Sequence, residues 1–333
     1  MISVITTIAE PTPCVRKLAA QLRSCQSRLV AVGDKKGPSR FDLEGAVFLP
    51  LSEQYQLPYE LAKLLPTGHY ARKNLGYLWA FSQTAPCVYE TDDDNAPDGR
   101  WVMRQLTAQA KPIKRSGWVN VYKYFSEDLI WPRGLPLDKI RDQNETTDIT
   151  KIESITVSAP VQQGLADLSP DVDAVWRLVC DRPFNFRDGA SVYLEPGAWC
   201  PFNSQNTWWW PEAYVLMYLP SYCSFRMTDI WRGFIAQRCL WAMGKGLLFY
   251  AADVVQERNE HNLQKDFEAE IPGYIGNDRL VDTLNRLTLA SGLEHAGNNL
   301  LTCYEALIAA EFFPARELDL VKAWLRDVAQ TRV

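Results

Sequence analysis

The sequence predicts an α/β fold with a mostly parallel central sheet and helices on both of its faces, followed by a C-terminal helical segment. Three observations lead to this prediction. Runs of β-branched and apolar residues alternate with helical stretches through the first hundred residues. Hydrophobic residues make up 47% of the 333-residue chain and charged residues 23%, as in an ordinary folded globule. Residues 277–330 instead carry apolar side chains at helical spacing.

The first hundred residues contain the clearest alternation of strand and helix. The run ISVITTI is β-branched and apolar throughout, as buried parallel strands are. The expected elements are strands at 2–8, 28–34, 46–51 and 87–90 and helices at 14–25, near 57–65 and at 72–83. Units of this kind form parallel sheets, and ligands collect at the carboxyl ends of the strands. We therefore expect Asp34 and the aspartates that follow residue 90 to lie at one edge of the sheet.

The remainder of the chain is expected to hold further strands and then helices. The expected strands are 101–106, 118–125 and 151–158, and the expected amphipathic helices lie near 277–290, 298–311 and 316–330. Residues 229–243 form a further helix, with Thr228 as its N-cap and Gly244 just past its end. We place a boundary in EIPGYIGND, so that residues 1–270 form the main domain and residues 271–333 a helical extension packed on it.

The composition excludes several classes of protein. A net charge of −5 offers no electrostatic case for binding nucleic acid. No stretch approaches the roughly 18 uninterrupted apolar residues of a membrane span, and the N-terminus lacks the features of a signal peptide. The eight cysteines are scattered without a C-x-x-C pair, which argues against a zinc ribbon or a redox dithiol. We therefore expect reduced thiols and a cytoplasmic protein.

Three consecutive aspartates, Asp92, Asp93 and Asp94, follow the strand that ends at Glu90. Adjacent carboxylates repel one another, and their pKa values rise unless a positive charge neutralises them. One interpretation is a solvated turn. The other is a divalent cation, Mg²⁺ or Mn²⁺, that one carboxylate binds directly and another binds through water, with phosphate oxygens in the open positions. An EF-hand loop fails, because counting from Asp92 the sixth position is Pro97 and the twelfth is Met103.

Two cations, Arg72 and Lys73, open the helix expected at 72–83. A helix start with free N–H groups and two cations is a good anion site, and a diphosphate is one candidate occupant. The alternative is a pair of solvated surface cations. No Walker A loop and no GxGxxG motif is present, which argues against P-loop phosphotransfer and dinucleotide redox chemistry. Asp34 would accept hydrogen bonds from a ribose or a base, or would merely begin a turn.

Asp229 lies in the first turn of its expected helix, where a carboxylate is favourable for stability alone. The alternative is a general base that deprotonates an acceptor hydroxyl, with Arg232 and Arg238 as neighbouring anion partners. Among the three histidines, His261 is a candidate for a late metal ligand, although a lone histidine is more often structural.

Several of these segments occur together in one order that resembles a known family. The segments are GDKK, LPTGHYARKNLGYLWA, YETDDDN, WPRGLPLD and TDIWRGFIAQRCLW, and they resemble the plant STELLO-type glycosyltransferases over most of residues 2–260. The stretch QGLADLSPDVDAVWRL is more weakly similar to the plant reversibly glycosylated polypeptides, which include UDP-arabinose mutases. Both resemblances imply a Rossmann-like GT-A fold, a nucleotide-sugar donor and a DxD-type metal site. We expect no membrane-anchoring segment like that of the STELLO proteins, so Golgi residence and partnership with cellulose synthase are not carried over.

The resemblance also implies roles for individual residues. Asp92, Asp93 and Asp94 become the metal and donor cluster, with Asp94 and Asp92 as the metal ligands, to which we add His261. The expected contacts to the donor are made by Thr6, Asp34, Arg72, Lys73, Asn74, Asp92 and Asp93. Asp229 would lie where acceptor-activating acids often lie in this fold.

The function that we expect is a metal-dependent glycosyltransferase that uses Mn²⁺ or Mg²⁺. It would transfer a sugar from a nucleoside-diphosphate sugar, a UDP-sugar above all, to a hydroxyl acceptor such as a glycan. Inversion follows if Asp229 is a base, and retention stays open if it only positions the acceptor. One alternative is a mutase that interconverts the pyranose and furanose forms of a nucleotide sugar. The second is a non-catalytic scaffold that binds a nucleotide sugar. A homodimer is a further candidate assembly, whereas neither nucleic acid nor a membrane is an expected partner.

Overall fold

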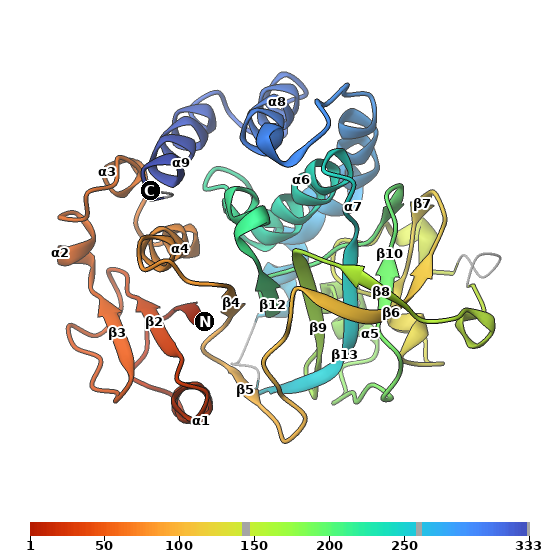
Figure 1. Cartoon of the computed structure of the whole chain (residues 1–333), viewed down its shortest axis with the longest axis horizontal. Coiled ribbons are helices and arrows are strands. Elements are labelled where there is room, and N and C mark those ends of the chain that lie inside the picture. The colour runs from red at the N-terminus through yellow and green to blue at the C-terminus, as the bar shows by residue number, and fades with distance from the viewer. Residues whose placement is uncertain (142–146, 258–261, 332–333) are drawn as a thin grey trace.

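The computed structural model describes residues 1–141, 147–257 and 262–331, which build a large central sheet with helices around it (Figure 1). The strands are β1 (Ile2–Thr6), β2 (Arg28–Val32), β3 (Ala46–Leu49), β4 (Val88–Thr91), β5 (Asn95–Pro97), β6 (Thr107–Ile113), β7 (Gly117–Trp118), β8 (Ile155–Ser158), β9 (Val161–Asp167), β10 (Val192–Leu194), β11 (Ala198–Trp199), β12 (Asn206–Trp209) and β13 (Leu247–Gln256). The α-helices are α1 (Pro13–Ser24), α2 (Leu51–Gln54), α3 (Leu61–Leu64), α4 (Lys73–Ser82), α5 (Ala174–Val179), α6 (Thr228–Ala242), α7 (Leu263–Asn285), α8 (Ala296–Ala309) and α9 (Glu317–Thr331).

The central sheet is parallel in its N-terminal part and mixed beyond it. Its 11 strands include the ordered path β3-β2-β1-β4-β12-β9-β13-β10-β6-β8, and β5 pairs with β13. Strands β1, β2, β3 and β4 are mutually parallel, whereas β12 runs antiparallel to both β4 and β9. Strand β13 is again parallel to β9. The predicted α/β class, with a large central sheet and C-terminal helices, is therefore confirmed, and the arrangement is consistent with a Rossmann-like fold.

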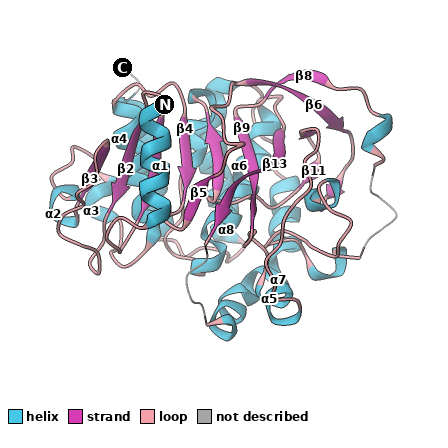
Figure 2. Ribbon diagram, turned by 90° about the horizontal axis from the view of Figure 1, so that it is seen from below, coloured by secondary structure: helices cyan, strands magenta, loops and turns pink. Residues whose placement is uncertain are grey.

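Helices cover both faces of the sheet, because its strands alternate their apolar side chains between two cores. Val4 and Val30 contribute to the core under α4 and α6, whereas Ile5 and Leu29 belong to the core under α1. Figure 2 shows α1 in front of the sheet and α4, α6 and α8 behind it. Thr12 is the N-cap of helix α1, because its hydroxyl accepts a hydrogen bond from the Val15 N–H at 3.1 Å.

Helix α4 lies very close to the parallel strands, and Gly76 makes this approach possible. A Cβ atom at Gly76 would lie 2.5 Å from a methyl group of Val4 and 2.8 Å from one of Val32. Any larger residue would push α4 away from β1 and β2. The close packing fixes the start of α4, and with it Arg72 and Lys73, relative to the carboxyl ends of the strands.

The C-terminal helices pack onto the N-terminal part of the molecule. Helix α9 contacts α3 and α4, and α8 contacts α6. The carboxylate of Asp327 accepts hydrogen bonds from the backbone N–H groups of Glu60 (2.9 Å) and Leu61 (2.8 Å) at the start of α3. Glu317 accepts hydrogen bonds from the Tyr218 hydroxyl at 2.5 Å and from the Tyr222 N–H at 2.8 Å. Two buried acids of α9 therefore bind segments that are distant in the sequence, the start of α3 and residues 218–222.

Several expected elements differ from the observed ones beyond residue 100. Residues 101–106 form no strand, and within 118–125 the chain forms only the end of β7 and a 3₁₀ helix, Val121–Tyr124. In the first of these segments Trp101 packs against the rings of Tyr89 and Trp208 instead of joining a ladder. Helix α6 begins at Thr228, and its N-cap is Met227, because a 3₁₀ helix leads directly into it. Gly244 follows the helix with φ of +69°, as expected.

Helix α7 runs through the segment where we expected a boundary. Pro272 lies inside the helix, and residue 270 is fully buried within it. Gly273 lies against Met227, where a Cβ atom would come within 2.3 Å of the sulfur. This close tertiary packing outweighs the local tendency of the Pro-Gly pair to end a helix. The division into residues 1–270 and 271–333 stays a prediction.

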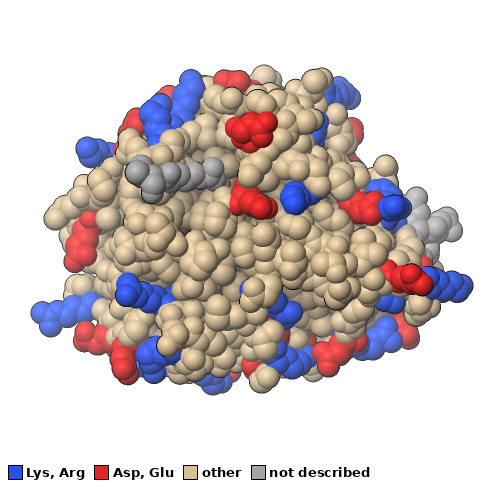
Figure 3. Space-filling model, in the orientation of Figure 1, with Lys and Arg blue, Asp and Glu red and all other residues tan. Residues whose placement is uncertain are grey.

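The charged surface residues and the helices bear on the partners expected from the composition. On the face seen in Figure 3, the basic and acidic residues that the structure describes are interspersed. No helix in the described part of the chain combines the length and the apolar character needed to cross a lipid bilayer.

Candidate active site

A cavity of about 220 Å³, here the aspartate cavity, opens at the edge of the sheet where β1, β4 and β13 end. Its lining comes from segments far apart in the sequence, because β12 runs antiparallel to β4 and begins at the same edge. The lining residues are Thr6, Tyr70, Asp92, Asp93, Asp94, Arg133, Pro170, Asp171, Val172, Arg177, Asn203, Ser204, Gln205, Phe225, Arg226, Asp229 and Gln256. The sequence placed the aspartates and Asp229 only in separate segments, and the fold brings them to one cavity.

A second cavity of about 290 Å³, here the Asp34 cavity, adjoins the first at the ends of β1 and β2. Its lining residues are Thr6, Thr7, Ile8, Val32, Gly33, Asp34, Lys36, Gly68, His69, Tyr70, Arg72, Asp93 and Phe225. Thr6, Tyr70, Asp93 and Phe225 line both cavities. The two cavities therefore adjoin and share part of their lining.

The three aspartates lie in the turn between β4 and β5. Each carboxylate has a different neighbour. The fully buried Lys73 ammonium donates to Asp92 at 3.0 Å and to the Thr91 carbonyl at 2.6 Å. Asp93 accepts a hydrogen bond from the Thr7 hydroxyl at 2.6 Å. Asp94 accepts from the Gln256 amide at 2.9 Å.

The negative charge of this turn is only partly neutralised. Burial raises the pKa of Asp92 and of Asp93, although Lys73 lowers both values in part. Burial, together with the charges of Asp92 and Asp93, raises the pKa of Asp94 to about 7. Among the residues that the structure describes, Asp94 receives hydrogen bonds from the side-chain amides of Asn95 and Gln256 and forms no ion pair. A positive charge placed beside Asp94 and Asp92 would therefore be stabilised.

The donor set suits a hard divalent cation such as Mg²⁺ or Mn²⁺, which binds carboxylate, phosphate and water oxygens. Within residues 1–141, 147–257 and 262–331, no three His, Cys, Asp or Glu side chains are grouped to hold an ion by themselves. Asp94 and Asp92 would therefore supply part of the coordination, and the donor and water the rest. His261, the third predicted ligand, lies outside the described residues.

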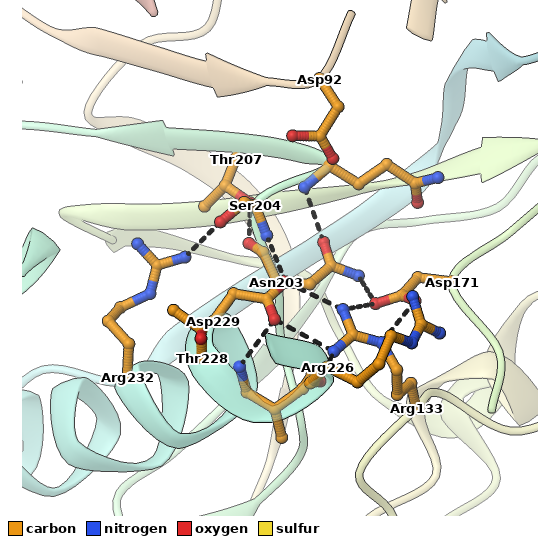
Figure 4. Close-up of polar contacts among 12 residues, drawn as sticks. Asp92, Arg133, Asp171, Asn203, Ser204, Thr207, Arg226, Thr228, Asp229 and Arg232 are labelled. Atoms are coloured by element: carbon orange, nitrogen blue, oxygen red, sulfur yellow. Dashed lines mark hydrogen bonds and ion pairs between the residues drawn. The ribbon is translucent and has the colours of Figure 1, made fainter. Parts of the chain in front are cut away.

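On the opposite wall of the aspartate cavity, Arg133 joins two carboxylates (Figure 4). Its guanidinium binds Asp171 with Nε and Nη2, both at 2.8 Å. It also binds Asp229 with Nη1 at 3.0 Å and Nη2 at 2.9 Å, and Nη1 donates to the carbonyl of Arg226. The Asn203 amide donates to Asp171 at 2.6 Å. All of these groups are buried or nearly buried, so the wall is rigidly held.

The environment of Asp229 keeps this carboxylate ionised. Burial alone would raise its pKa, but the guanidinium groups of Arg133, Arg232 and Arg226 outweigh burial and lower the pKa to about 2. The backbone N–H groups of Ser204 and Ile230 also donate to it, at 3.3 and 3.1 Å. Such a carboxylate is well placed to accept a hydrogen bond but is a weak base, because proton transfer favours a pKa near the working pH.

A buried ion pair lies beneath this wall. Arg232 binds Glu90 at 3.1 Å, and it donates to the Ser204 hydroxyl, also at 3.1 Å. Glu90 accepts further hydrogen bonds from Tyr77 and from the indole of Trp209. Arg232 therefore acts on Asp229 from a distance, while Arg238 donates to the carbonyls of Leu284 and Leu287 instead.

The remaining predicted donor contacts divide between the two cavities. Thr6 lines both, whereas Asp34 and Arg72 line only the Asp34 cavity. Lys73 lines neither and reaches the site through Asp92. Asn74 also lines neither, because its amide is engaged with the backbone of Leu219 at 2.8 and 2.9 Å. Asn74 therefore supports the fold around the site, and we leave it out of the proposed donor contacts.

Sequence reasoning gave no role to several residues of the site, including Arg133, Asp171 and Asn203. Arg133 and Asp171 lie within WPRGLPLD and LSPDVD, two stretches that were noted only as parts of a family pattern. Asn203 lies in no recognised motif. Only the tertiary structure brings Asp171 and Asn203 to the guanidinium that also holds Asp229.

Comparisons with known proteins agree with the predicted resemblance. Residues 226–333 match the model of a family described as STELLO glycosyltransferases. Two Arabidopsis thaliana proteins, which carry the names probable glycosyltransferase STELLO2 and STELLO1, are each 28% identical to this chain. The alignments cover 90% and 98% of this chain, but only 41% and 44% of the two relatives. The chain thus spans less than half the length of these relatives. The predicted similarity to STELLO-type glycosyltransferases is confirmed.

Proposed function

We propose that this protein is a metal-dependent glycosyltransferase that takes a sugar from a nucleoside-diphosphate sugar, a UDP-sugar above all, and transfers it to a hydroxyl acceptor such as a glycan. The observation that carries the proposal is the pair of adjoining cavities at the carboxyl ends of β1, β2 and β4. One is large enough for part of a nucleoside, and the other is lined by an under-neutralised carboxylate cluster. The similarity to glycosyltransferases over most of the chain supports the same proposal.

The donor would span both cavities, with its nucleoside near Asp34 and its diphosphate beside the aspartates. A cation bound by Asp94 and Asp92 would neutralise charge on the leaving diphosphate. Lys73, which lies outside the cavity lining, holds Asp92 in place by its hydrogen bond and adds a positive charge to this region. The hydroxyl of Thr7 fixes Asp93 at the junction of the cavities. These contacts are formed before the donor arrives, which is the condition for electrostatic stabilisation without reorganisation.

The acceptor would approach from the wall that Arg133 organises. We assign Asp229 the role of orienting an acceptor hydroxyl, because its carboxylate lines the cavity, stays ionised and is held in place by Arg133. The hydroxyl would take the place of the longest of its contacts, the Ser204 N–H at 3.3 Å. Its low pKa makes complete proton abstraction by Asp229 unfavourable. Retention therefore stays open beside inversion.

Binding of UDP with and without Mn²⁺, followed by thermal unfolding and by calorimetry, is the first test. We expect UDP to raise the melting temperature and Mn²⁺ to strengthen its binding. Incubation with UDP-sugars then separates the activities: slow release of UDP and free sugar supports a transferase, whereas a ring-isomerised UDP-sugar would support the mutase. If no nucleotide binds with or without Mn²⁺, the proposal is wrong. The alternative of a non-catalytic scaffold that binds a nucleotide sugar is then wrong as well.

The location of the protein belongs to the proposal as well. We propose a cytoplasmic protein, and the eight cysteines support this, since all of them are free thiols.

A further inference from the structure

Two residues that line the Asp34 cavity each carry a buried nitrogen donor with no hydrogen-bond partner among the described residues: Nε2 of His69 and Nη2 of Arg72. Both nitrogens are covered by neighbouring atoms, so a ligand would reach them only after a side chain of the lining shifts. An N–H group that is removed from water without an acceptor is costly, so native proteins rarely keep one without a reason. A ligand that brings acceptor oxygens into this cavity would satisfy both groups.

The tautomer of His69 follows from its other nitrogen. Nδ1 accepts a hydrogen bond from the N–H of Ala71 at 3.0 Å, so in the neutral ring the hydrogen is on Nε2. The ring is also held in place, since it stacks on Tyr70 at 5.6 Å with an interplanar angle of 9°. Burial lowers the pKa of His69, although Asp34 opposes this, and the ring stays neutral at physiological pH. His69 therefore presents one fixed donor.

Arg72 is only 1% exposed, and its guanidinium donates hydrogen bonds to neutral groups. Nε donates to the side-chain oxygen of Gln54 at 2.6 Å, and Nη1 donates to the carbonyl of Leu65 at 3.0 Å. These two contacts fix the plane of the guanidinium, and Nη2 has no hydrogen-bond partner among the described residues. Arg72 therefore holds a second donor in a fixed position beside the same cavity.

An acceptor and apolar surfaces complete the lining. The carboxylate of Asp34 accepts from the N–H groups of Gly68 and His69 at 2.7 and 3.0 Å, which fastens the loop that carries the histidine. Ile8 and Val32 supply apolar walls. A ligand complementary to these groups is a flat ring with two carbonyl oxygens and one N–H group, and among the common nucleobases uracil has this pattern.

We propose that His69 is a specificity-determining residue that, together with Arg72, selects uracil over bases that present amino groups. This inference rests on the proposed nucleotide-sugar donor. Cytosine and adenine would direct an amino group toward an N–H donor, and the unpaired donors would then be buried. Phe225 is 55% exposed and packs edge-on against the His69 ring at 5.7 Å, so we expect it to shift when the base enters.

Calorimetric titration with UDP, CDP and ADP in the presence of Mn²⁺ tests the inference. The wild-type protein is expected to bind UDP at least about tenfold more tightly than CDP or ADP. His69→Phe keeps an aromatic ring over Tyr70 but removes the donor, and we expect it to weaken UDP binding about tenfold while CDP and ADP change little. His69→Gln, which restores an N–H group near the same place, should recover most of the loss.

Two results would overturn the inference alone, and a third would overturn the proposed function as well. Equal affinity of the wild-type protein for UDP, CDP and ADP would leave the proposed function standing and remove the selectivity. An equal loss for all three nucleotides in a folded His69→Phe protein would mean that the donor serves the ribose or the phosphates. If the wild-type protein binds none of them, the proposed function fails as well. The affinities of the wild-type protein for UDP, CDP and ADP test the selectivity without any variant. This test therefore holds even if His69→Phe does not fold.

Discussion

Arg133 binds Asp229 through both terminal nitrogens, at 3.0 and 2.9 Å, while its Nε and Nη2 bind Asp171 at 2.8 Å. One buried guanidinium thus neutralises one of two carboxylates and holds both in fixed positions. These contacts explain why the acceptor wall stays ordered although it contains two buried or nearly buried carboxylates. It also makes Arg133 the residue on which the geometry of that wall depends.

Arg133→Lys should destabilise the protein strongly. A lysine ammonium cannot form the bidentate contacts, so both carboxylates would stay buried with poorer partners. Loss of these hydrogen bonds to buried carboxylates costs about 1–3 kcal/mol, and urea unfolding should show the loss.

The matched control is Arg182→Lys. Arg182 also binds an aspartate, Asp128, at 2.7 Å, but both side chains are more than half exposed. An exposed pair contributes less than about 1 kcal/mol. Similar losses in the two variants would show that burial of Arg133 does not matter as we argue.

Asp229→Asn should separate donor binding from turnover. The substitution removes the charge on the acceptor wall but touches neither Asp94 nor the Asp34 cavity, so UDP should bind in Mn²⁺ with nearly the affinity of the wild-type protein. Because Asp229 orients the acceptor, turnover followed as UDP release should fall about a hundredfold. Wild-type turnover in the variant would remove Asp229 from the reaction.

Asp94 should make the metal-free protein less stable at pH 8 than at pH 5. Its pKa is raised from 3.8 to about 7 by burial and by the two neighbouring carboxylates. The unfolded chain then releases this proton at a lower pH than the folded protein does, so stability falls as the pH rises between about 4 and 7. Between pH 5 and pH 8 the free energy of unfolding should fall by about 2–3 kcal/mol, because part of the full effect is already lost below pH 5.

Thermal unfolding at both pH values, with and without Mn²⁺, measures this effect. Mn²⁺ should restore the stability at pH 8, because it stabilises the ionised form of Asp94. Asp94→Asn should lower the difference between the two pH values and lose the response to Mn²⁺. Glu268→Ala, a change at an exposed acid of α7, should leave both unchanged. A full Mn²⁺ response in Asp94→Asn would exclude Asp94 as a ligand.

Asp327→Ala should cost more stability than a change at the next residue, Arg326→Ala. Asp327 accepts two backbone N–H groups of α3, which would be left unpaired at a cost of about 1–3 kcal/mol. Arg326 binds Glu60 at 2.7 Å, but both side chains are about half exposed, so its loss should cost less than about 1 kcal/mol. Denaturant titration compares the two variants, and the reverse order would contradict the role of Asp327.

The part of the fold that the sequence predicted well is the part that local pattern determines. Strands β1, β2 and β4 are short apolar runs, and α1, α6 and α9 are amphipathic or capped helices. Strand β9 was missed because it carries Gln162 and Gln163 toward buried partners, the carbonyl of Gln105 and the side chain of Asn203. Hydrogen bonds between distant segments satisfy these polar residues, and a local pattern does not contain them.

In the candidate site too, local sequence pattern indicates some residues, and only tertiary contacts reveal the others. The aspartates and Asp229 could be singled out because their positions beside a strand and at a helix start are visible in the sequence. Arg133 could not, since its importance comes from Asp171 and Asp229, which lie 38 and 96 residues away along the chain. Neither its neighbours in WPRG nor its spacing indicates that one guanidinium joins the two acids.

The anchoring of helix α9 has a consequence for biosynthesis. Glu317 is made 99 residues after its partner Tyr218, and Asp327 is made 266 residues after Leu61. At about 5–20 residues per second, a ribosome would need roughly 5–20 s to pass from Tyr218 to Glu317. During that interval the apolar surface of α4 that later receives α9 is uncovered. The nascent chain should therefore need a chaperone to protect this surface until its last helix has emerged.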